Sequence, residues 1–319
     1  MKATAVVIQQ PESLEIRELE LTAPGAGDVV VAIDWSGIST GTERLLWTGK
    51  MPSFPGMGYP LVPGYESVGR IIQAGPESGR REGEWVFVPG ASCYGEVKGL
   101  FGGASSRVVV PGGKVVPIPD RLGEEGVLLA LAATAYHAIF QGQAVDALTP
   151  SQLPDLIVGH GVLGRLLARV AVAAGASPVV WELNESRAAG AEGYTVVHPE
   201  RDERRDYHTI IDVSGDSALL DTLIARLARG GEVVLAGFYS QPLSFAFPPA
   251  FMREARIRCA AEWRAPDLAA VKALIESGRL SLGGLITHRR PAAEADEAYR
   301  TAFGDPECLK MVLDWRSSR

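Results

Sequence analysis

The sequence predicts an α/β protein of two domains, one rich in β-strands and one built on a doubly wound parallel sheet. Three observations lead to this prediction. The chain has 319 residues, which is long for one compact domain. Its first third consists of short apolar or alternating runs separated by Gly and Pro. Between residues 154 and 237, strand and helix patterns alternate, which indicates parallel strands joined by right-handed crossovers.

The β-rich part has strand patterns of about four to eight residues between turn signals, a rhythm typical of barrels and sandwiches. After Pro119 the pattern changes, because residues 124–141 lack proline, are rich in Ala and Leu, and are long enough for a helix. The expected strands are 3–8, 13–19, 28–33, 66–72, 84–88 and 105–111.

The parallel sheet is expected in the middle of the chain. Its strands are predicted at 155–159, 177–182, 194–198, 208–215 and 231–237, and its helices at 162–174, 186–190 and 217–228. A helix at 266–277, a strand at 285–291, a helix at 293–303 and a strand at 309–315 follow. Because the last strand can rejoin the first domain, we expect residues 1–125 and 281–319 to form one domain and residues 126–280 the other.

Composition and charge exclude several classes of function. The net charge of −7 and the pI near 5.4 argue against a nucleic-acid-binding surface. The most basic run, 201–205, is interrupted by two acids and is predicted to be a solvated loop. No apolar run reaches the roughly 18 residues that span a membrane, and no signal peptide is recognisable, so a cytoplasmic protein is expected. Cys93, Cys259 and Cys308 show no paired spacing, which argues against disulfides and cysteine chemistry.

The sharpest local motif is a glycine-rich turn between an apolar strand pattern and a helix pattern. Its first glycine permits a tight turn, its second lets a pyrophosphate approach the backbone, and its third lets the helix pack closely on the strand. The free N–H groups of the helix would face the phosphates, and the second residue, a histidine, would contribute its backbone N–H. The motif predicts a Rossmann dinucleotide-binding domain; the alternative is a plain strand-to-helix turn. Its residues are Gly159, His160, Gly161, Val162, Leu163 and Gly164.

An acidic residue follows this turn at a suitable distance. Glu182 ends the strand pattern 177–182, roughly 20 residues after the glycines. A carboxylate there accepts hydrogen bonds from both hydroxyls of an adenosine ribose and repels a 2′-phosphate, so NAD is favoured over NADP. Arg187 acts against this preference, because a basic residue nearby can reach a 2′-phosphate.

Several further segments stand in an order that resembles one large family. They are "MKATAVV", "SGISTGTE", "PLVPGYESVGRI", "GGASSRVVVP", "AATAYHAI", "VGHGVLG", "IIDVSG", "GGEVVLAGFY", "LITHRRP" and "ADEAYRTAFGDPECLKMVLDW". Over nearly the whole chain they resemble the medium-chain dehydrogenase/reductase superfamily, the alcohol dehydrogenase-like proteins. The resemblance implies a GroES-like β domain made from both chain ends, a Rossmann domain between them, substrate in the cleft, and a cofactor contact at Ala236. It also implies a homodimer through the edge of the cofactor-domain sheet, for which 231–239 and 243–247 are the candidate edge.

The chain departs from the superfamily at the positions of the zinc ligands. Where zinc-dependent members have two cysteines and a histidine, the resemblance aligns Ser39, Tyr65 and the neighbourhood of Ala130. Hydroxyl groups and one carboxylate, Glu66, do not make a zinc site. The cysteine quartet of the structural zinc lobe is also missing, since that stretch contains only Cys93. We therefore expect no metal.

The remaining polar side chains at these positions are the candidates for proton handling and charge stabilisation. Tyr65 is the leading candidate to contact the reacting oxygen, or else it fills the space of the missing metal. Ser39 and Thr40 occupy the loop in which family members carry a proton-relaying hydroxyl, and Thr40 is either that relay or a structural loop residue. Glu66 either acts as a base, if burial raises its pKa, or braces the loop by pairing with an arginine such as Arg44.

Within the superfamily, "WSGISTGTERLLW", "GMGYPLVPGYESVG" and "VVWE" resemble the dehydrogenases of bacteriochlorophyll biosynthesis. This likeness implies that the 3-(1-hydroxyethyl) group of a bacteriochlorophyllide a precursor is oxidised to the 3-acetyl group, with NAD⁺ taking the hydride. Trp47, Phe54 and Tyr59 either stack on such a flat Mg-tetrapyrrole or close an ordinary core. His137 is expected to be a packed, hydrogen-bonded histidine. The alternatives are a zinc-free quinone or enoyl reductase of the same superfamily using NAD(P)H, and a non-catalytic NAD(P)-binding redox sensor.

Overall fold

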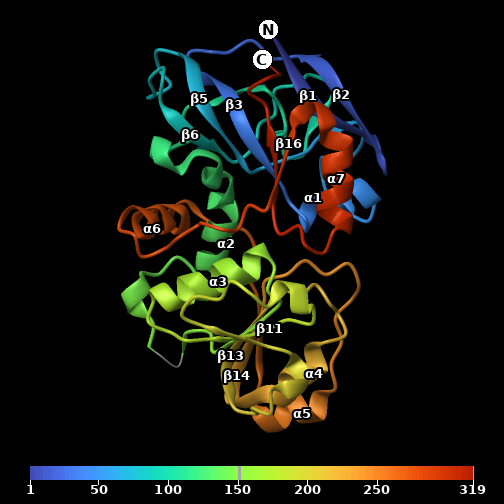
Figure 1. The fold of residues 1–319 in the computed structure, drawn as a ribbon, viewed down its shortest axis with the longest axis vertical. Coiled ribbons are helices and arrows are strands. Elements are labelled where there is room, and N and C mark those ends of the chain that lie inside the picture. Colours follow the sequence, from blue (N-terminus) through green and yellow to red (C-terminus); the bar gives the residue numbers. More distant parts are fainter. Residues whose placement is uncertain (150–151, 319) are drawn as a thin grey trace. The chain divides into compact units, whose positions relative to one another are not determined.

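The computed structural model describes residues 1–149 and 152–318, which divide into two compact units. Unit 1 consists of Met1–Ala130 together with the chain from Leu285 onwards, and unit 2 is Leu131–Gly284. Figure 1 shows unit 1 in blue, cyan and red and unit 2 mainly in green, yellow and orange. Unit 1 is rich in β-strands and unit 2 contains a parallel sheet, so the predicted fold class is confirmed. Among the described residues, no helix is long and apolar enough to cross a membrane.

Unit 1 is built on two sheets with an apolar core between their inward-facing residues. A four-stranded sheet has the order β2-β1-β4-β7, and a seven-stranded sheet has the order β16-β17-β3-β5-β6-β9, with β8 also paired to β3. The long strand β3 is central, and its Val29, Val30, Val31 and Ile33 are fully buried. The strands are β1 (Lys2–Gln10), β2 (Ser13–Glu20), β3 (Asp28–Ile38), β4 (Leu61–Val62), β5 (Ser67–Ala74), β6 (Trp85–Val88), β7 (Lys98–Gly99), β8 (Arg107–Pro111), β9 (Val116–Pro117), β16 (His288–Pro291) and β17 (Met311–Asp314).

Residues far apart in the sequence complete this unit. Strand β17 pairs antiparallel with β3, so that Met311 lies opposite Ile38, and β16 pairs parallel with β17. Helix α7 (Ala295–Gly304) buries Ala298, Tyr299 and Ala302, a spacing that gives one apolar face. That face packs on β2, β16 and β17, and Figure 1 shows α7 in red beside β16 and below β2. The expected return of the last strand to the first domain is therefore confirmed.

Unit 2 is built on a six-stranded parallel sheet in the order β12-β11-β10-β13-β14-β15. Counted along the unit this is the order 3-2-1-4-5-6 of a doubly wound dinucleotide-binding sheet, in which the first strand lies at the centre. The strands are β10 (Leu156–Val158), β11 (Val179–Trp181), β12 (Thr195–Val197), β13 (Tyr207–Asp212), β14 (Leu227–Leu235) and β15 (Arg256–Cys259). Besides most of α2 (Leu129–Phe140), its α-helices are α3 (Val162–Ala173), α4 (Leu220–Arg226), α5 (Phe247–Arg253) and α6 (Ala265–Glu276).

Several predicted helices differ from the observed ones. The long helix expected at 124–141 is the end of a 3-10 segment, η1 (Asp120–Leu128), followed by α2 (Leu129–Phe140); η1 itself is interrupted at Gly123, at φ 48°, just before the predicted range. The helix expected at 186–190 is a single 3-10 turn, η4 (Glu185–Arg187). Helix α1 (Thr42–Thr48) was not predicted, because it is short and begins directly after Gly41.

The predicted edge of the parallel sheet is wrong. Strand β14 pairs with β13 on one side and β15 on the other, so it lies inside the sheet, and residues 243–246 form no strand. The edge is β15, which the sequence did not reveal because its residues alternate between charged and apolar types over only four positions. Helix α5 before it was hidden by Pro248 and Pro249, which are accommodated in its first turn.

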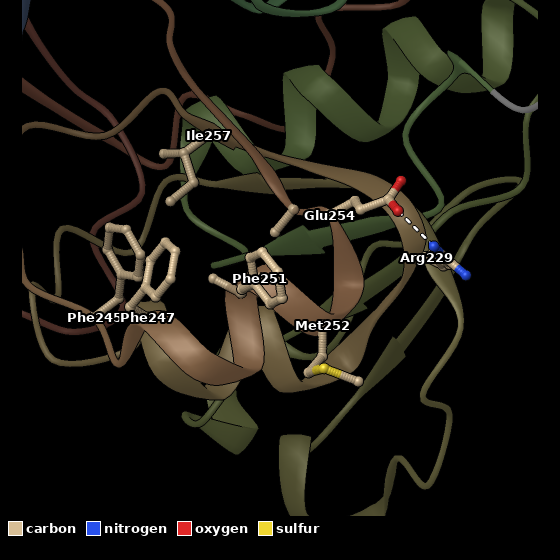
Figure 2. A pocket seen from close by; sticks show the side chains of 9 residues that line it. Arg229, Phe245, Phe247, Phe251, Met252, Glu254 and Ile257 are labelled. Atoms are coloured by element: carbon tan, nitrogen blue, oxygen red, sulfur yellow. Dashed lines mark hydrogen bonds and ion pairs between the residues drawn. The ribbon is translucent and has the colours of Figure 1, made fainter.

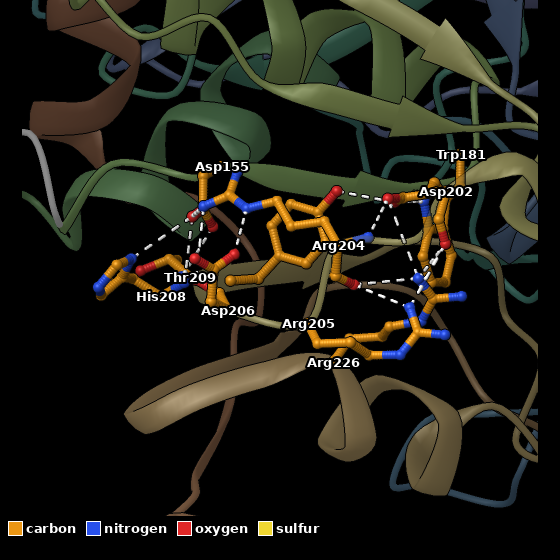
Figure 3. A network of polar contacts seen from close by, with 10 residues as sticks. Asp155, Trp181, Asp202, Arg204, Arg205, Asp206, His208, Thr209 and Arg226 are labelled. Atoms are coloured by element: carbon orange, nitrogen blue, oxygen red, sulfur yellow. Dashed lines mark hydrogen bonds and ion pairs between the residues drawn. The ribbon is translucent and has the colours of Figure 1, made fainter.

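The basic run 201–205 is a loop of mostly exposed residues, as predicted, and it also takes part in a network of polar contacts (Figure 3). Asp202 accepts hydrogen bonds from Trp181 Nε1 at 2.6 Å and Tyr207 Oη at 2.7 Å. Arg204 binds Asp155 at 2.8 Å, and its guanidinium stacks 4.2 Å from the centre of the Tyr207 ring. Asp155 precedes β10 and Tyr207 begins β13, so Arg204 braces the amino ends of these strands, away from the glycine turn.

Candidate active site

The glycine turn of unit 2 has the geometry that dinucleotide binding requires. Gly159 follows β10 at φ +104°, a conformation that favours glycine. A Cβ on Gly164 would lie 1.8 Å from the Gly159 carbonyl oxygen, so only glycine lets α3 pack this closely. A Cβ on Gly161 would meet nothing within 4 Å, which leaves open space beside the backbone. Gly161 is the N-cap of α3 and provides no side-chain cap, so the first N–H groups of the helix are left for an anion.

Glu182 lies next to this turn and joins it to the following loop. One carboxylate oxygen accepts the N–H of His160 at 3.1 Å, and the other accepts the N–H of Asn184 at 2.8 Å. Arg187 follows in η4, and its carbonyl oxygen accepts a bond from the His160 ring at 2.6 Å. The structure therefore brings His160, Glu182 and Arg187 together beside the glycines.

Ala236 lies on the same edge of the parallel sheet. It follows β14, and its N–H donates to the Asp212 carbonyl oxygen at 2.9 Å. Because all strands of this sheet run parallel, the carboxyl ends of β10, β11 and β14 share one edge, where Gly159, Glu182 and Ala236 stand. Val162 and Leu163 begin α3 there as well. The free N–H groups at the start of α3 and the Glu182 carboxylate fit a dinucleotide, whereas the N–H groups of His160 and Ala236 are already bonded within the protein.

Two residues near the turn were missed from the sequence. Arg165 on α3 and Tyr194 both contact His160, at 3.1 Å and 2.8 Å. The signal in the sequence was an arginine inside an apolar helix pattern, directly before Leu166 and Leu167, both of which are fully buried in the structure.

In unit 1, Ser39 and Tyr65 meet because their strands are neighbours. Ser39 follows β3 and Tyr65 precedes β5, and the two strands pair antiparallel with Ser36 opposite Ser67. The Ser39 and Tyr65 hydroxyl oxygens are 2.7 Å apart. The Tyr65 ring is partly buried and packs edge-to-face on Phe101, with 5.5 Å between ring centres.

The environment of Tyr65 keeps it protonated. Burial raises the pKa of the Tyr65 phenol well above its ordinary value, and the nearby negative charge of Glu66 raises it further. Hydrogen bonds from Ser39 and Thr42 act in the opposite direction but are smaller. At neutral pH the phenol is therefore a hydrogen-bond donor and not a base. The structure places Thr40 in an exposed position, and Thr42, which the sequence did not single out, is the threonine that bonds to Tyr65.

Glu66 has a partner that differs from the predicted Arg44. Its carboxylate is fully buried and lies 2.5 Å from the ammonium nitrogen of Lys310, which is 1% exposed and also donates to the Ile38 carbonyl oxygen at 3.1 Å. A Cβ on Gly37 would come within 2.4 Å of the same carboxylate, which explains the glycine there. The pairing makes Glu66 a brace between β5 and β17. Its other oxygen has no hydrogen-bond partner in the part of the chain that the structure describes.

Glu43 is a second buried carboxyl group that the sequence did not indicate. One oxygen accepts the Ser39 N–H at 3.2 Å, and the other is 2.5 Å from the Tyr299 hydroxyl. Burial raises the pKa of the Glu43 carboxyl to about 7, partly offset by the Tyr299 hydrogen bond. Glu43 thus fixes the loop that carries Ser39, and it titrates near neutral pH.

Most of the other candidate side chains take part in packing or hydrogen bonds within the protein. Trp47 is buried against Tyr299, the Tyr59 hydroxyl donates to the Leu46 carbonyl oxygen, and Phe54 is 37% exposed. His137 is buried and bonds to Asp267 at 2.8 Å, as its packing interpretation predicts. Across residues 1–149 and 152–318, no three side chains of His, Cys, Asp and Glu lie close enough together to hold a metal ion.

Comparisons with known proteins agree with this architecture. Residues 25–120 match the model of the alcohol dehydrogenase GroES-like domain. The chain is 58% identical to a 2-desacetyl-2-hydroxyethyl bacteriochlorophyllide A dehydrogenase of Rhodobacter capsulatus and 56% identical to one of Cereibacter sphaeroides, each over the full length of both chains. A short chain alcohol dehydrogenase from E. coli CFT073, solved with NADH, matches with a TM-score of 0.81 at 23% identity, covering 98% of this chain and 99% of that one. The protein therefore belongs to the alcohol dehydrogenase-like, medium-chain dehydrogenase/reductase superfamily and, within it, to the family of the bacteriochlorophyllide a dehydrogenases.

Proposed function

We propose that the protein oxidises the 3-(1-hydroxyethyl) group of a bacteriochlorophyllide a precursor to the 3-acetyl group, with NAD⁺ as the hydride acceptor. The observation that carries this proposal is the identity of 58% and 56%, along the whole chain, to two relatives named for a dehydrogenase of this kind. The proposal assigns residues 1–125 and 281–319 to the catalytic domain and residues 126–280 to the cofactor domain. It assumes a cytoplasmic reaction, where NAD⁺ is available.

The cofactor is expected at the glycine turn of unit 2. The N–H groups at the start of α3 would hold the pyrophosphate, and the open side of Gly161 gives it room. Glu182 would accept the hydroxyls of the adenosine ribose and repel a 2′-phosphate, which favours NAD⁺ over NADP⁺. Arg187 and Ala236 complete the proposed contacts. When bound, the nicotinamide ring supplies the acceptor for the hydride that leaves the carbinol carbon.

Tyr65 is proposed to act on the reacting oxygen as a hydrogen-bond donor. Its raised pKa makes it a poor base and a stable donor to the negative charge that develops on the oxygen. If the Ser39 and Thr42 hydroxyls donate to Tyr65, its own proton is left to point at the substrate. The carbinol hydrogen leaves as hydride, and the hydroxyl proton is released to solvent.

We propose that this chemistry needs no catalytic zinc. Ser39 and Tyr65 offer hydroxyl groups where zinc-dependent members have soft ligands, and hydroxyl groups hold Zn²⁺ weakly. Glu66, the remaining carboxylate, is already neutralised by Lys310 at 2.5 Å. The arrangement supports a site in which protein hydrogen bonds take over the stabilisation of charge.

A homodimer through the edge of the unit 2 sheet is also part of the proposal. Beside the edge strand β15 lies a hollow lined mainly by apolar side chains, with Phe245 and Phe247 next to each other and Arg229 paired with Glu254 (Figure 2). Phe247, Phe251 and Met252 are 66%, 65% and 71% exposed, which is unusual for such large apolar side chains. Light scattering of the wild type and of Phe251→Asp tests this; a monomeric wild type would contradict it.

The proposed reaction is tested by mixing the protein with NAD⁺ and 3-(1-hydroxyethyl) bacteriochlorophyllide a. We expect NADH together with the red-shifted absorption of the 3-acetyl product, before and after exhaustive chelation. An enzyme that loses activity with chelator and regains it with Zn²⁺ would contradict the metal-free site. No pigment oxidation, combined with reduction of simple quinones by NADPH, would replace the proposed function by that of a quinone reductase.

A further inference from the structure

The side chain of His160 is buried inside the glycine turn, where only its backbone was expected to matter. The residue is 0% exposed. Its Nδ1 lies 2.6 Å from the Arg187 carbonyl oxygen and its Nε2 lies 2.8 Å from the Tyr194 hydroxyl. A carbonyl oxygen can only accept, so Nδ1 carries the proton and Nε2 accepts from Tyr194. Burial lowers the pKa of His160 to about 4, which agrees with a neutral ring in this role.

Arg165 makes a second connection between the same segments. From α3, its Nε donates to the His160 carbonyl oxygen at 3.1 Å, and its Nη2 donates to the Arg187 carbonyl oxygen at 2.8 Å. The guanidinium is almost fully buried, and a Cβ on Gly190 would come within 2.7 Å of it. The loop between β11 and β12 therefore passes directly over Arg165.

We propose that His160, Arg165 and Tyr194 form a clamp that holds the 182–194 loop on the glycine turn and thereby positions Glu182 for the adenosine ribose. The clamp is defined as these three side chains, and none of them needs to touch the cofactor. They are positioning residues for cofactor selection, and the inference rests on the proposed nicotinamide cofactor.

The physical reason is preorganisation. Glu182 accepts N–H groups from both segments, from His160 in the turn and from Asn184 in the loop, so its carboxylate stays in place only while the two segments stay together. A loop that is ordered before the ligand arrives avoids the entropy cost of ordering on binding. A fixed carboxylate also repels a 2′-phosphate steadily, whereas a loose loop lets Glu182 turn away. The clamp should therefore strengthen NADH binding more than NADPH binding.

The test is the binding of NADH and NADPH to Tyr194→Phe without any substrate, measured by calorimetry or by nicotinamide fluorescence. We expect the Kd for NADH to rise roughly three- to tenfold, the effect of one hydrogen bond, and the Kd for NADPH to rise less. Tyr207→Phe is the matched control, because it removes another buried hydroxyl of unit 2 that donates to Asp202 at 2.7 Å, at the amino ends of the strands. Tyr207→Phe should keep the wild-type ratio of the two affinities.

Hydrogen exchange of the cofactor-free protein gives a second measurement. The backbone amides of 184–188 should exchange faster in Tyr194→Phe than in the wild type or in Tyr207→Phe. Arg165→Met, which removes both guanidinium bonds, should act in the same direction. Unchanged affinities and unchanged exchange in Tyr194→Phe, or equal losses in both tyrosine variants, would overturn the clamp. A wild type that binds NADH but oxidises no pigment would contradict the proposed function and leave the clamp standing.

Discussion

Replacing Lys310 by methionine is expected to destabilise unit 1 by about 3–5 kcal/mol, the usual cost of removing one partner from a buried ion pair. Lys310 and Glu66 are 1% and 0% exposed, and the ammonium nitrogen contacts both the Glu66 carboxylate at 2.5 Å and the Ile38 carbonyl oxygen at 3.1 Å. In Lys310→Met the carboxylate stays buried without a cation. For a unit of this size, each kcal/mol shifts the Tm by roughly 2–4 °C, so a decrease of about 10 °C is expected.

Differential scanning calorimetry is the suitable assay, because it resolves transitions of separate units. The double variant Lys310→Met, Glu66→Gln removes both charges and should recover a large part of the loss. The matched control is Lys2→Met, since Lys2 pairs with Glu18 at 2.6 Å but both side chains are more than half exposed, and its Tm should stay at the wild-type value. A Lys310→Met protein melting within about 1 °C of the wild type would refute the reasoning.

Three further predictions concern Tyr65 and Glu43 in unit 1 and Glu182 in unit 2. Tyr65→Phe keeps the ring on Phe101 and removes the donor, so kcat should fall roughly 100-fold with NADH affinity unchanged, and an unchanged kcat would assign Tyr65 to packing. Because the pKa of Glu43 is raised to about 7 in the folded protein, its contribution to stability is complete below its unfolded pKa and is lost as the pH rises through 7. As the pH rises from about 5 to 8, the Tm of Glu43→Gln should therefore increase relative to that of the wild type. If the difference between the two Tm values does not change with pH, Glu43 is not a buried, titrating carboxyl group. Glu182→Gln should reduce the NAD⁺ over NADP⁺ ratio of kcat/KM by roughly tenfold, whereas the exposed neighbour Glu185→Gln should leave it unchanged.

The features that the sequence predicted best are those fixed by local geometry. The glycine turn specifies its own backbone conformation, and the predicted helix 162–174 corresponds to α3 at Val162–Ala173. Glu182 was predicted beside the turn because it ends the next strand pattern, roughly 20 residues after the glycines, and the structure has it there.

The features that were missed depend on contacts between distant residues. An arginine such as Arg44 was the expected partner of Glu66, but the pairing of β17 with β3 brings in Lys310 instead. Glu43 and Tyr299 meet across 256 positions, and neither has a local pattern that indicates burial. Thr42 was passed over for Thr40 because a family motif fixes the loop but not which of its hydroxyls turns inward.

The ion pair between Glu66 and Lys310 also bears on how the chain matures during synthesis. The two residues are separated by 244 positions, so Glu66 leaves the ribosome long before Lys310 exists. Until β17 arrives, burying Glu66 would leave a carboxylate without a counter-charge, and the Trp35–Ile38 end of β3 would lack its β17 partner. The first 130 residues should therefore remain loosely assembled, and dependent on protection from aggregation, until β17 has been synthesised, whereas unit 2 can close earlier on its own contiguous sequence.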